Sequence, residues 1–340
     1  MRYVVFGGSG FVGRYTIKAL QEAIKTHSIA KGKIICADII KPQNLAQNIE
    51  FHSVDISQDF EFVFKKDDIV IHLAARAYAP KPPLKPFGTH KLKEYFFAVN
   101  VVGTKRIVSQ MLEFGCKNLI YFSTDMVYGK PEHLPVDTNH DRKPFGYYGL
   151  SKKESENFII AQRENVAGGG GLNATIFRPR MILGAGRYGI LLKLFRLMEL
   201  NLPLPLIGNG KNCYQMVSVK DCAQAIICAI KKGVPNDEFN LGSKNPPCIK
   251  DLLGFVCEQS GSKSMLLPTW AKRVKWVLAL FENLGMPLMY KEQYQIADEQ
   301  YLIDISKTCE KLDWQPKDDD KDMLLEAYKE YQKRTKNGLC

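Results

Sequence analysis

Several features that would place a protein in other classes are missing from this chain. No apolar run approaches the about 18 consecutive residues that a membrane-spanning helix needs. Nine cysteines are present, but no two form a C-x-x-C pair, which favours reduced cytosolic thiols over a disulfide framework or a zinc site. Met1 leads directly into a predicted strand, so we expect no signal peptide. These absences predict a cytoplasmic protein without a metal site.

The composition also argues against a nucleic-acid partner. The 340 residues are 45% hydrophobic and 24% charged, as in an ordinary globular α/β protein that is long enough for two lobes. A formal net charge of +11 suits an anionic ligand or surface. Because lysines and arginines are scattered and no base-reading motif is recognisable, we predict that the partner is not nucleic acid.

The first thirteen residues contain the most informative pattern. An apolar run from Tyr3 to Phe6 predicts a buried parallel strand, and a helix is predicted to follow from Phe11. Between them lie Gly7, Gly8 and Gly10, with Gly13 one turn into the helix. Such glycines let the backbone approach a pyrophosphate, and the first-turn N–H groups of the helix point at the anion. The stretch therefore predicts a dinucleotide site.

A second strand ends at an acidic residue. Lys33 to Asp38 is apolar except at its two ends, and Asp38 lies 25 residues after Gly13. A carboxylate at this place accepts hydrogen bonds from both hydroxyls of an adenosine ribose and repels a 2′-phosphate. Ile39 supplies no compensating charge, so the sequence favours NAD over NADP.

Strands and helices alternate through the first half of the chain. Apolar runs predict strands at 3–6, 33–38, 51–55, 67–75, 117–123 and 173–178, with helices at 11–23, 93–114 and 148–164 between them. This alternation predicts an α/β fold with a Rossmann-like, doubly wound parallel sheet and a smaller, interleaved C-terminal substrate lobe. We assign 1–180 to the NAD-binding domain, to which 213–235 return, and 181–212 and 236–340 to the substrate-binding lobe.

A second group of residues predicts hydride-transfer chemistry. Tyr148 and Lys152 are four residues apart and share one face of a predicted helix. A neighbouring cation favours the phenolate, which suits Tyr148 to act as a general base. Thr124 follows a predicted strand and can hydrogen-bond the same substrate oxygen. Beside a nicotinamide, these groups would remove an alcohol proton as hydride leaves the carbon.

Taken together, these motifs resemble the extended short-chain dehydrogenase/reductase family, and within it the NAD-dependent sugar epimerase/dehydratase branch. The resemblance also covers segments such as Ser123-Thr-Asp-Met-Val-Tyr-Gly129 and Val217-Ser-Val-Lys-Asp221, and it extends over nearly the whole chain. It implies catalysis by Thr124, Tyr148 and Lys152 and a homodimer through the helices at 93–114 and 148–164. It implies an NAD site formed by Gly7, Gly10, Phe11, Val12, Gly13, Asp38, Asp55, Ile56, Leu73, Ala74, Ala75, Asn100, Tyr148, Lys152 and Arg178.

The sequence departs from that branch at two substrate positions. Related 4,6-dehydratases carry Asp-Glu after the catalytic Thr, whereas this chain has Asp125-Met126. Asp125 remains a candidate acid, but Met126 cannot remove a proton, so dehydration is disfavoured. Tyr214 lies near the place where many nucleotide-sugar enzymes have an Arg for the diphosphate. Arg187 and Lys211 are candidates to contact the diphosphate in place of that Arg. The alternative is that both are ordinary solvated surface residues.

The predicted helix at 271–284 leaves two interpretations open. Packing within the substrate lobe or a dimer contact is favoured, because apolar stripes are common in cores. The alternative is an interfacial helix on an anionic membrane. The stripe consists of Val274, Val277, Leu278, Phe281 and Leu284, whereas Lys272, Lys275, Trp276 and Leu280 lie off it and Arg273 flanks it.

The combined prediction is an NAD-dependent sugar 4-epimerase that acts through a transient 4-keto intermediate. Its substrate is a sugar diphosphate, either a nucleotide-sugar or a polyprenyl-diphosphate sugar, because the resemblance includes epimerases of both kinds. A dehydrogenase or reductase of a lipophilic alcohol, similar to 3β-hydroxysteroid dehydrogenases, is the second hypothesis. A non-catalytic NAD-binding scaffold is the third.

Overall fold

A seven-stranded parallel sheet forms the centre of the larger lobe. The computed structural model describes residues 1–42, 45–78, 89–164, 171–189, 191–283, 289 and 291–336. The strand order is β10-β6-β5-β4-β1-β2-β3, and every neighbouring pair is parallel. This confirms the predicted doubly wound fold. The strands are β1 Arg2–Phe6, β2 Lys33–Asp38, β3 Ile49–Ser53, β4 Ile69–His72, β5 Asn118–Phe122, β6 Asn173–Pro179 and β10 Glu238–Leu241.

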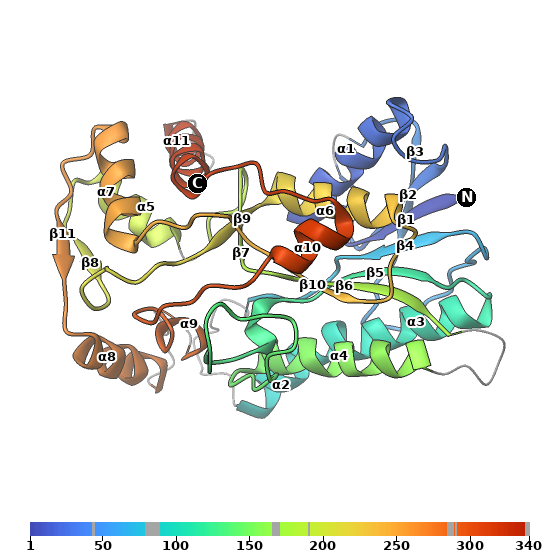
Figure 1. Cartoon of the computed structure of the whole chain (residues 1–340), viewed down its shortest axis with the longest axis horizontal. Helices are drawn as coiled ribbons and strands as arrows, with labels where there is room; N and C mark the ends of the chain where they lie inside the picture. Colours follow the sequence, from blue (N-terminus) through green and yellow to red (C-terminus); the bar gives the residue numbers. More distant parts are fainter. Residues whose placement is uncertain are drawn as a thin grey trace.

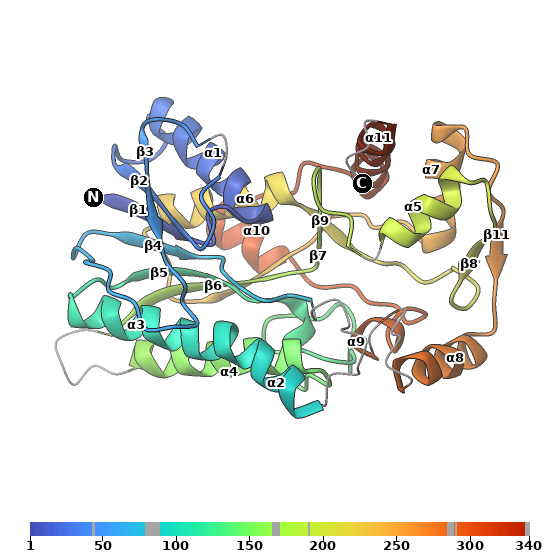
Figure 2. The ribbon, with the colours of Figure 1, turned by 180° about the vertical axis from the view of Figure 1, so that it is seen from behind.

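Helices cover both faces of this sheet, as Figures 1 and 2 show. On one face lie α1 Phe11–Lys25, α6 Val219–Lys231 and α10 Ser306–Leu312, and on the other lie α3 Thr104–Glu113 and α4 Tyr147–Glu164. Successive residues of β1 alternate between two cores. Tyr3 and Val5 belong to the core with α1 and α6, whereas Val4 and Phe6 belong to the core with α3 and α4. A strand buried on both faces is apolar throughout, which explains the unbroken run in the sequence.

The helix predicted at 93–114 is not one regular helix. It consists of α2 Thr89–Phe97, the π-helical turn η1 Ala98–Gly103, and α3. A π-helical turn carries an extra residue per turn and is frequent at functional sites. The prediction of a continuous helix was therefore wrong at the turn that contains Asn100.

The smaller lobe is built around a third hydrophobic core. It contains α5 Leu191–Glu199, α7 Ile249–Ser260 and α11 Asp320–Lys336. Two short parallel pairs accompany them, β7 Met181–Leu183 with β9 Met216–Ser218 and β8 Leu204–Leu206 with β11 Leu266–Pro268. The lobe also includes α8 Ala271–Asn283 and α9 Lys291–Tyr294, and Figure 1 places α8 and β11 at its outer end. Within the described parts of the chain, none of the helices combines the length and hydropathy that a bilayer-spanning segment requires.

The chain passes between the lobes more than once. α6, from the segment 213–235, packs against α1. The segment 236–340, assigned to the substrate lobe, nevertheless begins with β10, which is the edge strand beside β6, and it later returns with α10 against β10. The physical reason is that α6 acts as a crossover helix, and the strand after such a helix joins the parallel sheet.

Candidate active site

The glycine loop and the segment after β4 are in close backbone contact. Gly7 has a φ of +79°, and a Cβ atom on it would lie 2.6 Å from the backbone nitrogen of Ala74. A Cβ atom on Gly13 would lie 2.2 Å from the carbonyl oxygen of Gly7. Only glycine fits at either place, because the nearest atoms are backbone. The fold thus brings together two segments that the sequence assigned to one cofactor site.

The amino-terminal end of α1 has the form of an anion site. Gly10 is its N-cap and offers no side chain to the first-turn N–H groups. A helix start without a side-chain cap leaves these donors available to a pyrophosphate. This end and the glycine cradle fit a dinucleotide, with Phe11 and Val12 contributing the first backbone N–H groups.

Asp38 lies at the rim of this loop, where a ribose would be recognised. Its Oδ2 accepts a hydrogen bond from the backbone N–H of Ser9 at 2.9 Å, which joins the end of β2 to the glycine loop. The two residues that follow, Ile39 and Ile40, are exposed and uncharged. This arrangement fits the predicted preference for a ribose with a free 2′-hydroxyl.

The two residues predicted to flank the adenine differ in environment. Asp55 is exposed and accepts hydrogen bonds from the backbone and the hydroxyl of Ser57 at 2.9 and 2.7 Å, which lowers its pKa. Ile56 is buried against Gly103, where an added Cβ atom would lie 2.7 Å from its Cγ1. Their contact with an adenine remains a prediction.

Asn100 connects the loop after β4 to the catalytic helix. Its Oδ1 accepts from the backbone N–H of Arg76 at 2.8 Å. Its Nδ2 donates to the carbonyl of Arg76 at 3.0 Å and to Ser151 Oγ at 2.9 Å, so both amide hydrogens have partners within the protein. These contacts give Asn100 a positioning role, because Ser151 lies between Tyr148 and Lys152 on α4. Direct contact with the cofactor remains a prediction.

Lys152 is buried at the carboxyl end of β5. Its Nζ donates to the carbonyl of Phe122 at 2.6 Å and to Tyr121 Oη at 3.2 Å. Burial lowers the pKa of Lys152 to about 7, although the charge of Glu156 opposes this shift. The carbonyl of Phe122, two residues before Thr124, thereby holds a lysine that can change its charge near neutral pH.

The start of α4 lies against the turn that carries Thr124. This turn, η2 Asp125–Val127, is capped by Thr124, whose Oγ1 accepts from the backbone N–H of Met126 at 3.3 Å. A Cβ atom on Gly149 would lie only 2.6 Å from the carbonyl oxygen of Met126. This close approach places Tyr148, which is half-buried, beside the turn. The three predicted catalytic residues therefore come from adjoining ends of β5, η2 and α4.

Asp125 forms a buried ion pair that the sequence analysis did not predict. Arg180 Nη1 lies 2.5 Å from Asp125 Oδ2, and Thr124 Oγ1 donates to Asp125 Oδ1 at 3.2 Å. The Arg180 guanidinium lies between the rings of Tyr214 and Tyr301, at 4.3 and 4.0 Å from their centroids. Burial opposes its charge, but Tyr214, Asp125 and Tyr301 together raise the pKa of Arg180 above its ordinary value. The sequence signal that could have indicated Arg180 as a site residue is its position directly after β6, at the carboxyl end of the sheet.

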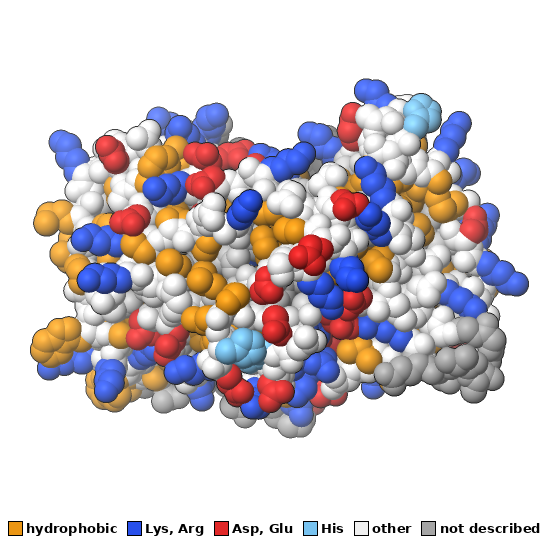
Figure 3. Space-filling view, viewed as in Figure 1, with side chains coloured by type: hydrophobic (Ala, Val, Ile, Leu, Met, Phe, Trp, Pro, Cys, Tyr) orange, Lys and Arg blue, Asp and Glu red, His pale blue; other side chains and the backbone are white. Residues whose placement is uncertain are grey.

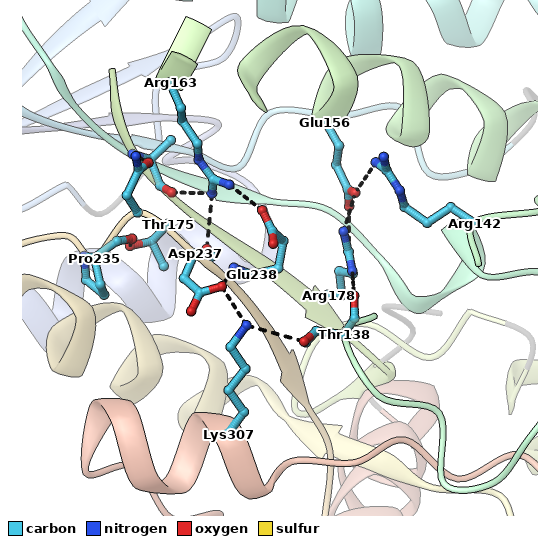
Figure 4. A network of polar contacts seen from close by, with 12 residues as sticks. Thr138, Arg142, Glu156, Arg163, Thr175, Arg178, Pro235, Asp237, Glu238 and Lys307 are labelled. Carbon is cyan, nitrogen blue, oxygen red and sulfur yellow. Dashed lines mark hydrogen bonds and ion pairs between the residues drawn. The ribbon is translucent and has the colours of Figure 1, made fainter. Parts of the chain in front are cut away.

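Arg178 belongs to a separate buried network, which Figure 4 shows from close by. Its Nε and Nη2 donate to the two carboxylate oxygens of Glu156 at 3.0 and 2.8 Å, and Arg142 contacts the same carboxylate at 2.8 Å. The remaining amino group, Nη1, donates to Tyr128 Oη and to the carbonyl of Thr138, each at 3.0 Å. These contacts tie α4 to β6, so they support a structural role. A contact of Arg178 with the cofactor remains a prediction.

The candidate diphosphate residues have different surroundings. Arg187 lies over the ring of Tyr78 at 4.7 Å and that of Phe11 at 5.8 Å, which places it beside the glycine loop. Lys211 is exposed, with its backbone N–H bonded to Asn209 Oδ1. Tyr214 is part of the Arg180 cluster. Among the residues that the structure describes, no three His, Cys, Asp or Glu side chains gather as a metal site.

Comparison with known proteins gives one family. The model of the NAD dependent epimerase/dehydratase family matches residues 3–242. An uncharacterized protein of Sinorhizobium fredii is 29% identical over 97% of this chain and 78% of its own length. The UDP-glucose 4-epimerase of Vibrio cholerae is 27% identical over 91% of this chain and 89% of its own length. The NAD-bound crystal structure of the dTDP-glucose 4,6-dehydratase DesIV from Streptomyces venezuelae superposes with a TM-score of 0.74 at 18% identity, covering 98% of each chain.

Proposed function

The chain belongs to the NAD-dependent epimerase/dehydratase family, and we propose that within this family it is a sugar 4-epimerase. Family membership makes NAD the cofactor, and the relatives include both UDP-glucose 4-epimerases and dTDP-glucose 4,6-dehydratases. The choice between the two reactions therefore depends on the side chains around Thr124.

The ion pair between Asp125 and Arg180 is the observation that favours an epimerase over a dehydratase. A 4,6-dehydratase needs one group to remove the C5 proton and another to protonate the departing hydroxyl. Both carboxylate oxygens of Asp125 already have partners, because Oδ2 pairs with Arg180 Nη1 at 2.5 Å and Oδ1 accepts from Thr124 Oγ1 at 3.2 Å, so this side chain is engaged within the protein. Its neighbour Met126 has no ionisable group. Both observations support a site that oxidises and reduces the same carbon without eliminating water.

We assign three roles to the residues of the site. Tyr148 accepts the proton of the C4 hydroxyl as general base and returns it after hydride has come back to the other face. Thr124 orients the hydroxyl, and a charged Lys152 lowers the pKa of the Tyr148 phenol. When bound, the nicotinamide of NAD would be the acceptor of the hydride that leaves C4 of the sugar, and the cofactor would be unchanged after each cycle. Gly7, Gly13 and the start of α1 would hold its pyrophosphate, and Asp38 its adenosine ribose.

The carrier of the sugar is either a nucleotide or a polyprenyl diphosphate. Tyr214 has no positive charge to offer a nucleotide diphosphate, and its ring packs on the Arg180 guanidinium. Arg187 offers a guanidinium beside the glycine loop instead. This arrangement supports a substrate whose diphosphate is recognised differently from that of typical nucleotide-sugar enzymes, and it leaves both carriers to be tested.

A paired epimerisation assay tests this proposal. The protein and NAD are incubated with UDP-N-acetylglucosamine, and separately with the same sugar on a polyprenyl diphosphate in detergent. Chromatography should reveal the 4-epimer from one of them. Tyr148→Phe should reduce the rate by about 10²–10⁴-fold, as expected for loss of a general base. The variant should still bind NAD.

Each alternative predicts a distinct result. Accumulation of NADH with another alcohol would replace the epimerase by the dehydrogenase hypothesis. A 4-keto-6-deoxy sugar would indicate a dehydratase and show that the contacts of Asp125 do not prevent the elimination of water. Unchanged cellular function of Tyr148→Phe would favour the scaffold hypothesis.

We also propose that the protein is a homodimer through η1, α3 and α4. Val102 on η1 and Phe114 at the end of α3 are exposed apolar side chains on this side of the molecule. Sedimentation equilibrium should give twice the monomer mass. Val102→Lys should lower that mass toward the monomer, and a monomeric wild-type protein would contradict the proposal.

A further inference from the structure

Exposed apolar side chains gather at the outer end of the smaller lobe. Six of them, here called the distal surface, are 40–68% exposed: Leu200, Met265, Trp270, Trp276, Val277 and Leu280. Figure 3 shows hydrophobic side chains with Lys and Arg at this end of the molecule, over β11 and α8. Single exposed apolar residues need no explanation, but a group with two tryptophans marks an interaction site.

Hydrogen bonds hold two chain segments together in this surface, the turn after α5 with β8 and the segment that contains β11. β8 and β11 are parallel neighbours, and the backbone N–H of Leu204 donates to the carbonyl of Met265 at 2.8 Å. Lys263 N–H donates to Asn201 Oδ1 at 2.7 Å, which places the turn after α5 beside the start of β11. Trp270 then leads into α8, with Val274 N–H donating to its carbonyl at 3.1 Å.

The helix α8 presents an apolar face to solvent. Trp276, Val277 and Leu280 are spaced as i, i+1 and i+4, and all three are exposed. On the inner side Leu278 is buried, while Val274 and Phe281 are half-buried. Val277, which belongs to the predicted apolar stripe, is 40% exposed in the single chain. Leu284, the last residue of that stripe, lies outside the described residues.

The segment 263–281, which supplies five of the six residues of the distal surface, carries only positive charges, whereas the exposed Glu199 precedes Leu200. Lys263, Lys272 and Arg273 are exposed, and the Arg273 guanidinium lies 3.8 Å from the ring centroid of Trp270. Lys275 does not belong to this group, because its Nζ contacts Asp298 and the carbonyl of Gln295. The sequence from 263 to 281 contains no Asp or Glu. Tryptophan beside such cations is the composition of a lipid headgroup contact.

We propose that the distal surface binds an anionic lipid bilayer as a peripheral contact. Trp270, Trp276 and Leu280 enter the headgroup region, and Lys263, Lys272 and Arg273 contact the lipid phosphates. A second copy of the chain is a poorer occupant, because a two-fold contact would place these cations against their own copies. The proposal is independent of which sugar the active site accepts.

Vesicle binding of the full chain tests this proposal. The protein should co-sediment with vesicles of phosphatidylcholine and phosphatidylglycerol. Much less of the protein should co-sediment with vesicles of phosphatidylcholine alone. High salt should weaken the contact. Because Trp314 is buried, a blue shift of tryptophan fluorescence on binding reports Trp270 and Trp276, the other two of the three tryptophans.

Two variants distinguish binding through this surface from nonspecific adsorption to vesicles. Trp276→Ser with Leu280→Ser should weaken partition to the anionic vesicles at least about tenfold, because two apolar side chains no longer enter the interface. Val63→Ser, at a residue of similar exposure between β3 and β4, should have no effect. Binding of NAD should be the same in all three proteins.

Three results would overturn the proposal. One is absence of sedimentation with either type of vesicle. Another is equal partition of the double variant and the wild-type protein. The third is a concentration-dependent dimer that the double variant abolishes, which would assign the distal surface to a second copy of the chain.

Discussion

Apolar residues have opposite surroundings in β1 and in α8. In β1, Tyr3 to Phe6 are at most 1% exposed, because helices cover both faces of the sheet. In α8, Trp276 is 68% exposed even though the helix has a second, inward-facing apolar side at Leu278. Both segments are rich in hydrophobic residues, but α8 also carries Lys272, Arg273 and Lys275. The comparison teaches that the number of covering layers decides whether apolar residues form a core or a surface.

The same contrast applies to charged residues. In the larger lobe, Glu156 is buried between Arg142 and Arg178, and Lys152 is buried beside the Phe122 carbonyl. At the distal surface, the cations are exposed. Buried charges fix the positions of α4, β5 and β6 relative to one another, whereas exposed charges are free to meet a partner.

The largest effect is expected from a pair of helical glycines, one in each lobe. Gly13→Ala would place a Cβ atom 2.2 Å from the Gly7 oxygen, so the glycine loop must move. We expect a loss of more than about 4 kcal/mol in the free energy of unfolding, or loss of NAD binding. Gly254→Ala in α7 meets nothing closer than Leu266 Cδ1 at 3.9 Å and should stabilise the protein by about 0.5–1 kcal/mol. Urea denaturation and NAD titration measure both, and equal tolerance would contradict the cradle.

The second comparison is between a buried and an exposed carboxylate. Glu156→Gln removes the charge shared by Arg142 and Arg178 and should cost about 3–5 kcal/mol in unfolding free energy. Glu326→Gln, which breaks an exposed pair with Lys220 at 3.2 Å, should cost less than about 1 kcal/mol. Urea midpoints at neutral pH compare the two. A mild effect of Glu156→Gln would show that water reaches the network.

The third prediction concerns pH. The pKa of Lys152 is about 7 in the folded protein and near 10.5 when unfolded. Between these values the unfolded chain binds the extra proton, so stability rises with pH. The difference in unfolding free energy between wild-type protein and Lys152→Met should grow by up to about 1.4 kcal/mol per pH unit from pH 7 to 10. Urea unfolding of the NAD-free proteins measures it, with Lys272→Met as a control for removing any lysine. A difference that does not change with pH would show that Lys152 stays charged.

The smallest effect is expected at the distal surface. Trp276→Ala should change the free energy of unfolding by less than about 0.5 kcal/mol, because an exposed side chain loses little packing. Thermal unfolding without vesicles gives the value. A loss above about 2 kcal/mol would mean that Trp276 is packed in the free protein, and it would remove the contrast between the two regions.

Local patterns determined most of the larger lobe. The alternation of apolar strands with helices was sufficient to predict the parallel sheet, because strand burial leaves a local pattern. The β1 run, the glycine spacing and Asp38 predicted a dinucleotide site at the edge of that sheet. Thr124, Tyr148 and Lys152 could be found in the same way, since each follows a strand end or shares one helix face. The fold and the family are confirmed, and the role of each site residue remains a prediction.

Contacts between distant segments decided the rest. The partner of Asp125 is Arg180, 55 positions away, and Arg180 lies between two rings from other segments. The π-helical turn at Asn100, the return of β10 to the main sheet and the outward face of α8 likewise depend on what packs against them. The sequence by itself determined the fold class and the family, and it predicted which residues bind NAD and transfer hydride, because strand, glycine and helix-face spacings are local patterns. Only the tertiary structure decided which charges pair and which apolar side chains stay exposed, because burial is a property of the neighbours that the fold supplies.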